Sequence, residues 1–174
     1  MNQCDGNRKE KWIMGKIAEI ITSELLRDSG FKVFAMGYEH TLKELTQMNN
    51  KEFNRESKTA RLIRQIPDFV VVDAKGEPFT VEVKYRSHTK DRFWFNNAKI
   101  EELELVLYRW NALILLMTDK KPYFRIINKY MIGKRKSMPL QEYKMLSIPA
   151  EIINAYECLV DLFIIQPGLN KEQA

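Results

Sequence analysis

Three charged side chains lie in a part of the chain where strands are expected. Asp68 comes at the start of one apolar run, and Glu82 and Lys84 lie on the next. Residues two apart on a strand point to the same face, so Glu82 and Lys84 share a face. Carboxylate oxygens are the ligands that Mg²⁺ prefers, and a neighbouring lysine can stabilise developing negative charge. These residue types suit hydrolysis of a phosphodiester by a metal-activated water.

A β-hairpin must position these groups. Residues 66–73 form a compact apolar run that contains three consecutive valines, residues 74–77 have turn chemistry, and residues 78–86 read as a second strand. The turn folds Asp68 back beside Glu82 and Lys84. An unpaired charge in a buried sheet costs several kcal/mol, so we expect these groups to compensate one another or to hold a cation.

The rest of the chain supplies helices and further strands. Apolar spacing predicts helices over 9–29 and 97–110, a C-terminal helix over 149–165, and strands over 31–35, 112–117 and 123–128. The strand over 112–117 is so uniformly apolar that we expect it to be buried on both faces. The polar segment 39–64 is interpreted as a basic insertion, either helical or mobile. This order of elements predicts an α/β fold with a mixed sheet and helices on both faces.

Composition limits the class of protein. The chain has 174 residues, of which 45% are hydrophobic and 29% charged, so we expect residues 1–174 to form a single domain. Cys4 and Cys158 lie near opposite ends and suggest neither a disulfide framework nor a zinc ribbon. There is no apolar stretch of membrane-spanning length, and the N-terminal residues do not resemble a signal peptide. A soluble, cytoplasmic protein without a membrane partner is expected.

The charged residues occur in a pattern that resembles the PD-(D/E)xK nuclease superfamily. The signature is Pro67-Asp68 followed by Glu82-Val83-Lys84. A glycine four residues before a glutamate on the first helix, Gly15 and Glu19, matches the archaeal Holliday-junction resolvases and related endonucleases of that superfamily, as does Gly30-Phe31 before the first strand. The resemblance implies a restriction-endonuclease-like three-layer α-β-α core with a mixed central sheet flanked by helices.

The resemblance also assigns roles to residues. It implies that Asp68, Glu82 and Glu19 hold Mg²⁺, with Mn²⁺ as a substitute, and that Lys84 activates water. Two features depart from the pattern. The segment 39–64 is longer than the corresponding connection in compact resolvases, and the helix after the third strand lacks the glutamine and tyrosine pair of the exonuclease-like branch. That helix carries instead Glu101, Glu102, Glu104 and Tyr108.

Charge favours a polyanionic partner. The net charge is +5 and the isoelectric point is near 9.1. Candidate phosphate contacts are basic residues of the insertion together with one residue after the catalytic pair: Arg55, Lys58, Arg61, Arg64 and Arg86. A second basic group spans residues 129–136. We expect DNA as partner and, from the resemblance, a homodimer, since many enzymes of this fold cut the two strands of a duplex with two sites.

The sequence thus predicts a metal-dependent deoxyribonuclease, an endonuclease that needs no organic cofactor. Two alternatives stay open. The first is a catalytically silent nuclease-fold protein that binds nucleic acid or serves in an assembly. The second is an unrelated regulatory or protein-interaction domain, in which Glu82 and Lys84 form a solvated surface pair.

Overall fold

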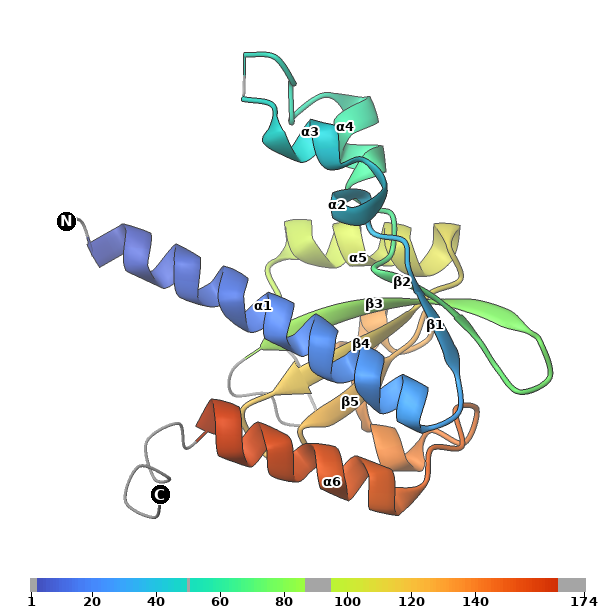
Figure 1. Ribbon diagram of the computed structural model, residues 1–174. Coiled ribbons are helices and arrows are strands. Elements are labelled where there is room, and N and C mark those ends of the chain that lie inside the picture. Colours follow the sequence, from blue (N-terminus) through green and yellow to red (C-terminus); the bar gives the residue numbers. More distant parts are fainter. Residues whose placement is uncertain (1–2, 50, 87–94, 166–174) are drawn as a thin grey trace.

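The computed structural model describes residues 3–49, 51–86 and 95–165, and it contains a six-stranded mixed sheet (Figure 1). The strands are neighbours in the order in which they follow along the chain. Their bounds are β1 (Lys32–Ala35), β2 (Phe69–Val72), β3 (Pro78–Arg86), β4 (Leu113–Thr118), β5 (Phe124–Ile127) and β6 (Met138–Pro139). The predicted α/β class, with a mixed sheet flanked by helices, is confirmed.

The connections decide the strand directions. A tight turn joins β2 to β3, and Gly76 in this turn has a φ of +86°, a conformation that glycine adopts without steric cost. These two strands are antiparallel. Helix α5 (Asn97–Arg109) lies between β3 and β4 in the chain, and this pair is parallel because a crossover returns the chain to the same end of the sheet. The other neighbouring pairs are antiparallel.

The helices make a layer on each side of the sheet. Helices α1 (Gln3–Asp28) and α6 (Ala150–Val160) cover one face, and α5 covers the other (Figure 1). On the first face Leu25 and Leu26 of α1 pack in one cluster with Val83. On the second face Leu103 and Leu107 of α5 pack against β4. The alternation of side chains along each strand divides the core between the two faces.

Strand β4 lies at the centre of the core. Ile114, Leu115, Leu116 and Met117 are all fully buried. Ile114 and Leu116 belong to the cluster under α5, whereas Leu115 and Met117 belong to the cluster under α1 and α6. A strand covered on both faces needs apolar residues at every position, which is what the sequence of this strand provides.

Three short helices follow β1 and form a projection at one end of the molecule (Figure 1). They are α2 (Tyr38–Thr41), α3 (Lys43–Gln47) and α4 (Lys58–Ile63). The Ser57 side chain caps α4 by accepting a hydrogen bond from the backbone N–H of Ala60 at 3.1 Å. The Arg55 guanidinium donates to the carbonyl of Met48 at 3.0 Å, and that of Arg64 donates to the carbonyl of Arg55 at 2.9 Å. Arginine side chains therefore tie the segment together.

The element boundaries differ from the sequence-based expectations at several places. Helix α1 begins at Gln3, earlier than residue 9, and the C-terminal helix changes from α-helical to π-helical geometry over Asp161–Ile165. Strand β6 was not predicted; its two residues pair with β5 at the edge of the sheet. Within the described part of the chain, no helix has the length and apolar character needed to cross a membrane.

Candidate active site

The four predicted site residues line one cavity. Glu19 comes from α1, Asp68 precedes β2, and Glu82 and Lys84 lie on β3; the cavity has a volume of about 160 Å³. Residues of α2 and α5 complete its walls. The antiparallel pairing of β2 with β3 and the packing of α1 on the sheet bring these distant parts of the chain together.

Asp68 is fixed by backbone contacts on both sides. Its Oδ2 accepts a hydrogen bond from the backbone N–H of Val83 at 2.7 Å. Its own carbonyl accepts from the backbone N–H groups of Met36 at 2.9 Å and Gly37 at 3.2 Å. The chain at Gly37 packs directly against this residue, since a Cβ there would lie in van der Waals contact, 3.5 Å from the Asp68 Cα. The carboxylate therefore has a defined position at the beginning of β2.

Glu82 and Lys84 form an ion pair that is largely withdrawn from solvent. The side chain of Glu82 is 10% exposed and that of Lys84 is 21% exposed. The Lys84 Nζ donates to the Glu82 Oε1, and it also donates to the carbonyl of Val83 at 3.0 Å. Both charges thus have partners, as buried charges require. The open alternative of a solvated surface pair does not match this burial.

The pKa values of this pair are shifted by burial and by a third charge. Burial, together with the charge of Asp68, raises the pKa of Glu82 to about 7, although Lys84 acts in the opposite direction. Burial by itself would lower the pKa of Lys84, but the charges of Glu82 and Asp68 outweigh it and raise the pKa. Lys84 is therefore an ammonium at neutral pH.

Glu19 is connected to the projecting segment by a lysine. The Lys16 Nζ lies 2.9 Å from Glu19 Oε2 and 2.5 Å from Glu39 Oε2 on α2. Burial raises the pKa of Glu19, and the charge of Asp68 adds to this, while Lys16 acts in the opposite direction. The charge of Asp68 therefore raises the pKa of Glu19 as it raises that of Glu82.

The donor set of the cavity fits a small hard cation. The charge of Asp68 raises the pKa values of both Glu82 and Glu19, and a divalent cation would relieve this repulsion. Within residues 3–49, 51–86 and 95–165, no three or more Asp, Glu, His and Cys side chains form a ready ligand group. Mg²⁺ does not need one, because it usually binds one or two carboxylates and keeps several waters.

The five predicted nucleic-acid contacts occupy different environments. Arg64 lines the cavity, while Lys58 and Arg61 lie on the exposed surface of α4. Arg55 is half-buried and holds the projecting segment together, as described above. Arg86 is half-buried too, and burial lowers its pKa. Its guanidinium carbon lies 4.6 Å from the centre of the Phe95 ring.

Sequence reasoning missed several residues of the cavity. Lys16, Glu39, His40 and Glu102 line it, and Glu102 accepts a hydrogen bond from Lys99 at 2.8 Å. Lys16 lies three residues before Glu19, so helical spacing could have indicated their contact. Nothing in the local sequence indicates that α2 returns to the site, since that depends on the path of the chain after β1.

No protein-family model matches the chain, and no curated protein matches it. Among solved structures, it is similar to Hjc of Archaeoglobus fulgidus, a Holliday junction resolvase from an archaeal hyperthermophile. The two chains are 15% identical, and the match covers 79% of this chain and 97% of the other with a TM-score of 0.40.

Proposed function

We propose that this protein is a metal-dependent deoxyribonuclease that cuts DNA internally. The observation that carries the proposal is the convergence of Glu19, Asp68, Glu82 and Lys84 on one cavity, with the lysine ammonium withdrawn from solvent beside two carboxylates. Two carboxylates and an ammonium are costly to bury, and their chemistry suits a phosphate ester. The net charge of +5 suits a polyanionic substrate.

Lys84 serves as an electrostatic group in this proposal. Its raised pKa keeps it protonated at neutral pH, so the ammonium does not remove a proton from water. It donates hydrogen bonds instead, to orient the attacking water and to stabilise the additional negative charge of the pentavalent phosphorus. In the reaction the water oxygen bonds to phosphorus and gives up a proton to solvent, while the bond from phosphorus to one ester oxygen breaks and that oxygen takes up a proton.

Asp68 and Glu82 would hold Mg²⁺ or Mn²⁺, with assistance from Glu19. The bound cation would supply a more acidic water and positive charge for the scissile phosphate. Asp68 is suited to the role because its hydrogen bond to Val83 fixes the carboxylate before a ligand arrives. Glu82 is suited because burial raises its pKa and so disfavours the carboxylate, whereas a bound cation would favour it.

The DNA would pass over the cavity between α2 and α5. Arg64 at the cavity, with Lys58 and Arg61 on α4, would contact phosphates along this path. A homodimer is part of the proposal, because each active site would cut one strand of the DNA duplex. Light scattering after gel filtration measures the oligomeric state directly.

Cleavage assays on plasmid, linear, single-stranded and four-way-junction DNA test the proposal. Each is run with Mg²⁺, Mn²⁺ or EDTA, on the wild type, on Lys84→Ala and on the matched control Lys75→Ala in the exposed turn. We expect metal-dependent cutting that Lys84→Ala abolishes and Lys75→Ala retains, while circular dichroism shows that both variants fold.

Other outcomes separate the alternatives. Turnover that persists in Lys84→Ala contradicts the mechanism. A wild type that cuts none of the substrates but shifts them in a gel is a silent DNA-binding relative. A wild type that neither cuts nor binds DNA belongs to the unrelated class.

A further inference from the structure

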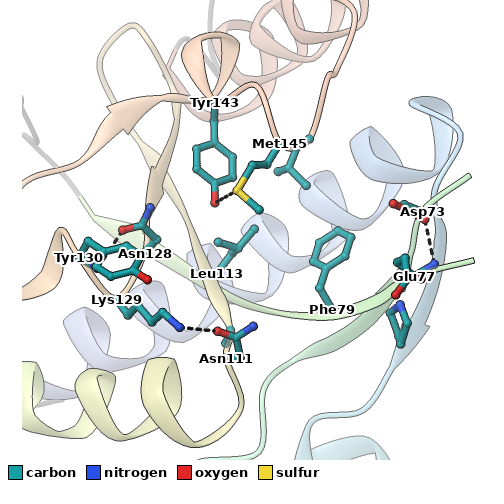
Figure 2. Close-up of a pocket in the computed structure, with 13 residues that line it drawn as sticks. Asp73, Glu77, Phe79, Asn111, Leu113, Asn128, Lys129, Tyr130, Tyr143 and Met145 are labelled. Carbon is teal, nitrogen blue, oxygen red and sulfur yellow. Dashed lines mark hydrogen bonds between the residues drawn. The ribbon is translucent and has the colours of Figure 1, made fainter. Parts of the chain in front are cut away.

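A second and larger cavity lies at the other end of β3. Its volume is about 540 Å³, within the usual range for small-molecule sites, and loops and strand ends surround it (Figure 2). Phe79, one of its lining residues, shares a face of β3 with Val81 and Val83. Glu82 and Lys84 point to the opposite face. This cavity and the candidate active site share no lining residue.

The floor of the cavity is apolar. Figure 2 shows Phe79 and Leu113 near its centre; Phe79 is the second residue of β3, and Leu113 is the first residue of β4. Leu146 also lines the cavity and belongs to the core cluster beneath α1 and α6, and Phe79 and Leu113 are partly buried and pack against that cluster. The floor is therefore part of the rigid core and does not depend on a ligand for its shape.

One side of the cavity offers aromatic and thioether surface. Tyr143 is buried, and its hydroxyl lies 3.3 Å from the sulfur of Met145. Tyr130 and Met145 are 74% and 82% exposed and lie at the mouth of the cavity. Flat rings and a polarisable sulfur favour a planar aromatic ligand.

The same side carries two carboxamides. The Asn128 Oδ1 accepts a hydrogen bond from the backbone N–H of Tyr130 at 3.0 Å, and the Asn111 Oδ1 accepts from the Lys129 Nζ at 3.1 Å. These contacts fix both side chains at the cavity. The Asn128 side chain also hydrogen-bonds the Tyr143 hydroxyl, and the Asn111 amide carries an NH₂ group with two donors. An asparagine amide pairs with the edge of an adenine through one donor and one acceptor.

Two carboxylates stand across the floor from the amides. Figure 2 shows Asp73 and Glu77 on the far side of Phe79 from Asn128 and Tyr130. The Asp73 Oδ1 accepts from the backbone N–H groups of Lys75 at 2.8 Å and Glu77 at 2.9 Å, so the turn itself orients this carboxylate. Carboxylates in this position suit the hydroxyl groups of a ribose, as in dinucleotide sites.

We propose that this cavity binds a purine nucleoside of the adenosine type. The base lies on Tyr130 and Tyr143 with its edge toward Asn111 and Asn128, and the ribose hydroxyls reach Asp73 and Glu77. The apolar floor covers the rest of the ligand. The proposal is independent of the nuclease function, because the two cavities share no lining residue.

Titration with adenosine, followed by amide NMR and calorimetry, tests the proposal. We expect saturable binding that shifts signals of the strand ends and loops around Leu113 and leaves those of Asp68 and Glu82 in place. Tyr130→Ala should weaken binding at least fivefold, and Glu77→Gln should weaken it to a smaller extent. Both side chains are exposed, so neither change removes core packing.

Matched controls make the outcome decisive. Phe163→Ala, at another exposed aromatic residue, and Lys84→Ala, in the candidate active site, should leave the affinity unchanged. D-ribose alone should not bind at the concentrations that saturate the site with adenosine. The proposal is wrong if adenosine shows no saturable binding at millimolar concentration, if Tyr130→Ala binds as well as the wild type, or if the shifted signals surround Asp68.

Discussion

The carboxylate of Asp68 accepts the backbone N–H of Val83 and so continues the pairing of β2 with β3 beyond the end of the β2 ladder. In the ladder the last paired residue of β3 on this side is Val81, opposite Phe69. The Asp68 Oδ2 thus accepts the hydrogen bond that a main-chain carbonyl would accept in a regular ladder. The other oxygen of the same carboxylate is free to face the cavity. Strand pairing and site geometry are coupled in a single residue.

This coupling predicts different effects for two changes at Asp68. Asp68→Asn keeps an oxygen acceptor for the Val83 N–H but removes the charge, whereas Asp68→Ala leaves that donor without its partner. We expect Asp68→Ala to be less stable than Asp68→Asn by about 1–3 kcal/mol, the cost of an unsatisfied buried donor. Urea unfolding measures the difference, and equal stabilities would contradict the structural role of the hydrogen bond.

Divalent cations should stabilise the protein through the carboxylates of the cavity. At a concentration ten times the Kd, a bound cation adds about 1.4 kcal/mol. That raises the Tm of a chain of this length by about 3–6 °C. Glu82→Gln should lose this increase with Mg²⁺ or Mn²⁺. Glu101→Gln, on the exposed side of α5, should keep it. An increase of the same size in Glu82→Gln would place the cation elsewhere.

The Lys16 bridge should hold α2 against α1. Lys16 contacts both Glu19 and Glu39, and all three side chains are partly exposed, so the contribution to global stability should be below about 1 kcal/mol. Lys16→Ala should instead speed hydrogen exchange of the amides of His40 and Thr41 in α2. Lys9→Ala, on the exposed N-terminal part of the same helix, provides the control. Unchanged exchange in α2 would show that the bridge does not restrain it.

Strand β4 should be the most sensitive part of the core. Leu115→Ala removes a fully buried side chain and should cost about 2–5 kcal/mol. Leu105→Ala, at a leucine of α5 that is 46% exposed, should change the free energy of unfolding by no more than about 0.5 kcal/mol. Urea unfolding of both variants tests this, and comparable losses would mean that β4 is not the centre of the core.

The C-terminal turn should respond to acid. Hydrogen bonds from Tyr123 and Lys121 lower the pKa of Asp161 below its unfolded value. Its contribution is therefore complete above about pH 4, near the unfolded pKa, and is lost as the pH falls through the folded pKa. Asp161→Asn should flatten the dependence of stability on pH in this range, and the exposed control Glu142→Gln should not. Parallel acid profiles for Asp161→Asn and the wild type would rule this contribution out.

The sequence indicated the central strands well because their chemistry is local. The run before Gly76 contains β2, and residues 78–86 coincide with β3, since turn residues and apolar runs mark both strands. The strand predicted over 112–117 differs from β4 by one residue at each end. Strand β6 was not predicted, because it has only two residues before a 3-10 turn and so shows no periodic pattern.

The candidate site, too, was predictable from the sequence only in part. Spacing and resemblance pointed to Glu19, Asp68, Glu82 and Lys84, which the fold places around one cavity. The contact of Lys16 with Glu39 joins two helices across β1 and has no local signal. Nor could the sequence show that Arg55 is engaged in holding the projecting segment, because charge alone does not distinguish a solvated arginine from one that bonds to backbone carbonyls.

The order of strands in the sheet has a consequence for how the chain acquires its structure. Each strand pairs with the strand that precedes it in the chain, so the sheet grows by adding the next segment to an edge that already exists. The β2–β3, β4–β5 and β5–β6 ladders join residues close in the chain, whereas the β1–β2 ladder closes over the projecting segment and the β3–β4 ladder closes over the α5 crossover. Local pairing favours fast folding, so the slowest searches in this topology are the closures of the two long-range pairs, β1 with β2 and β3 with β4.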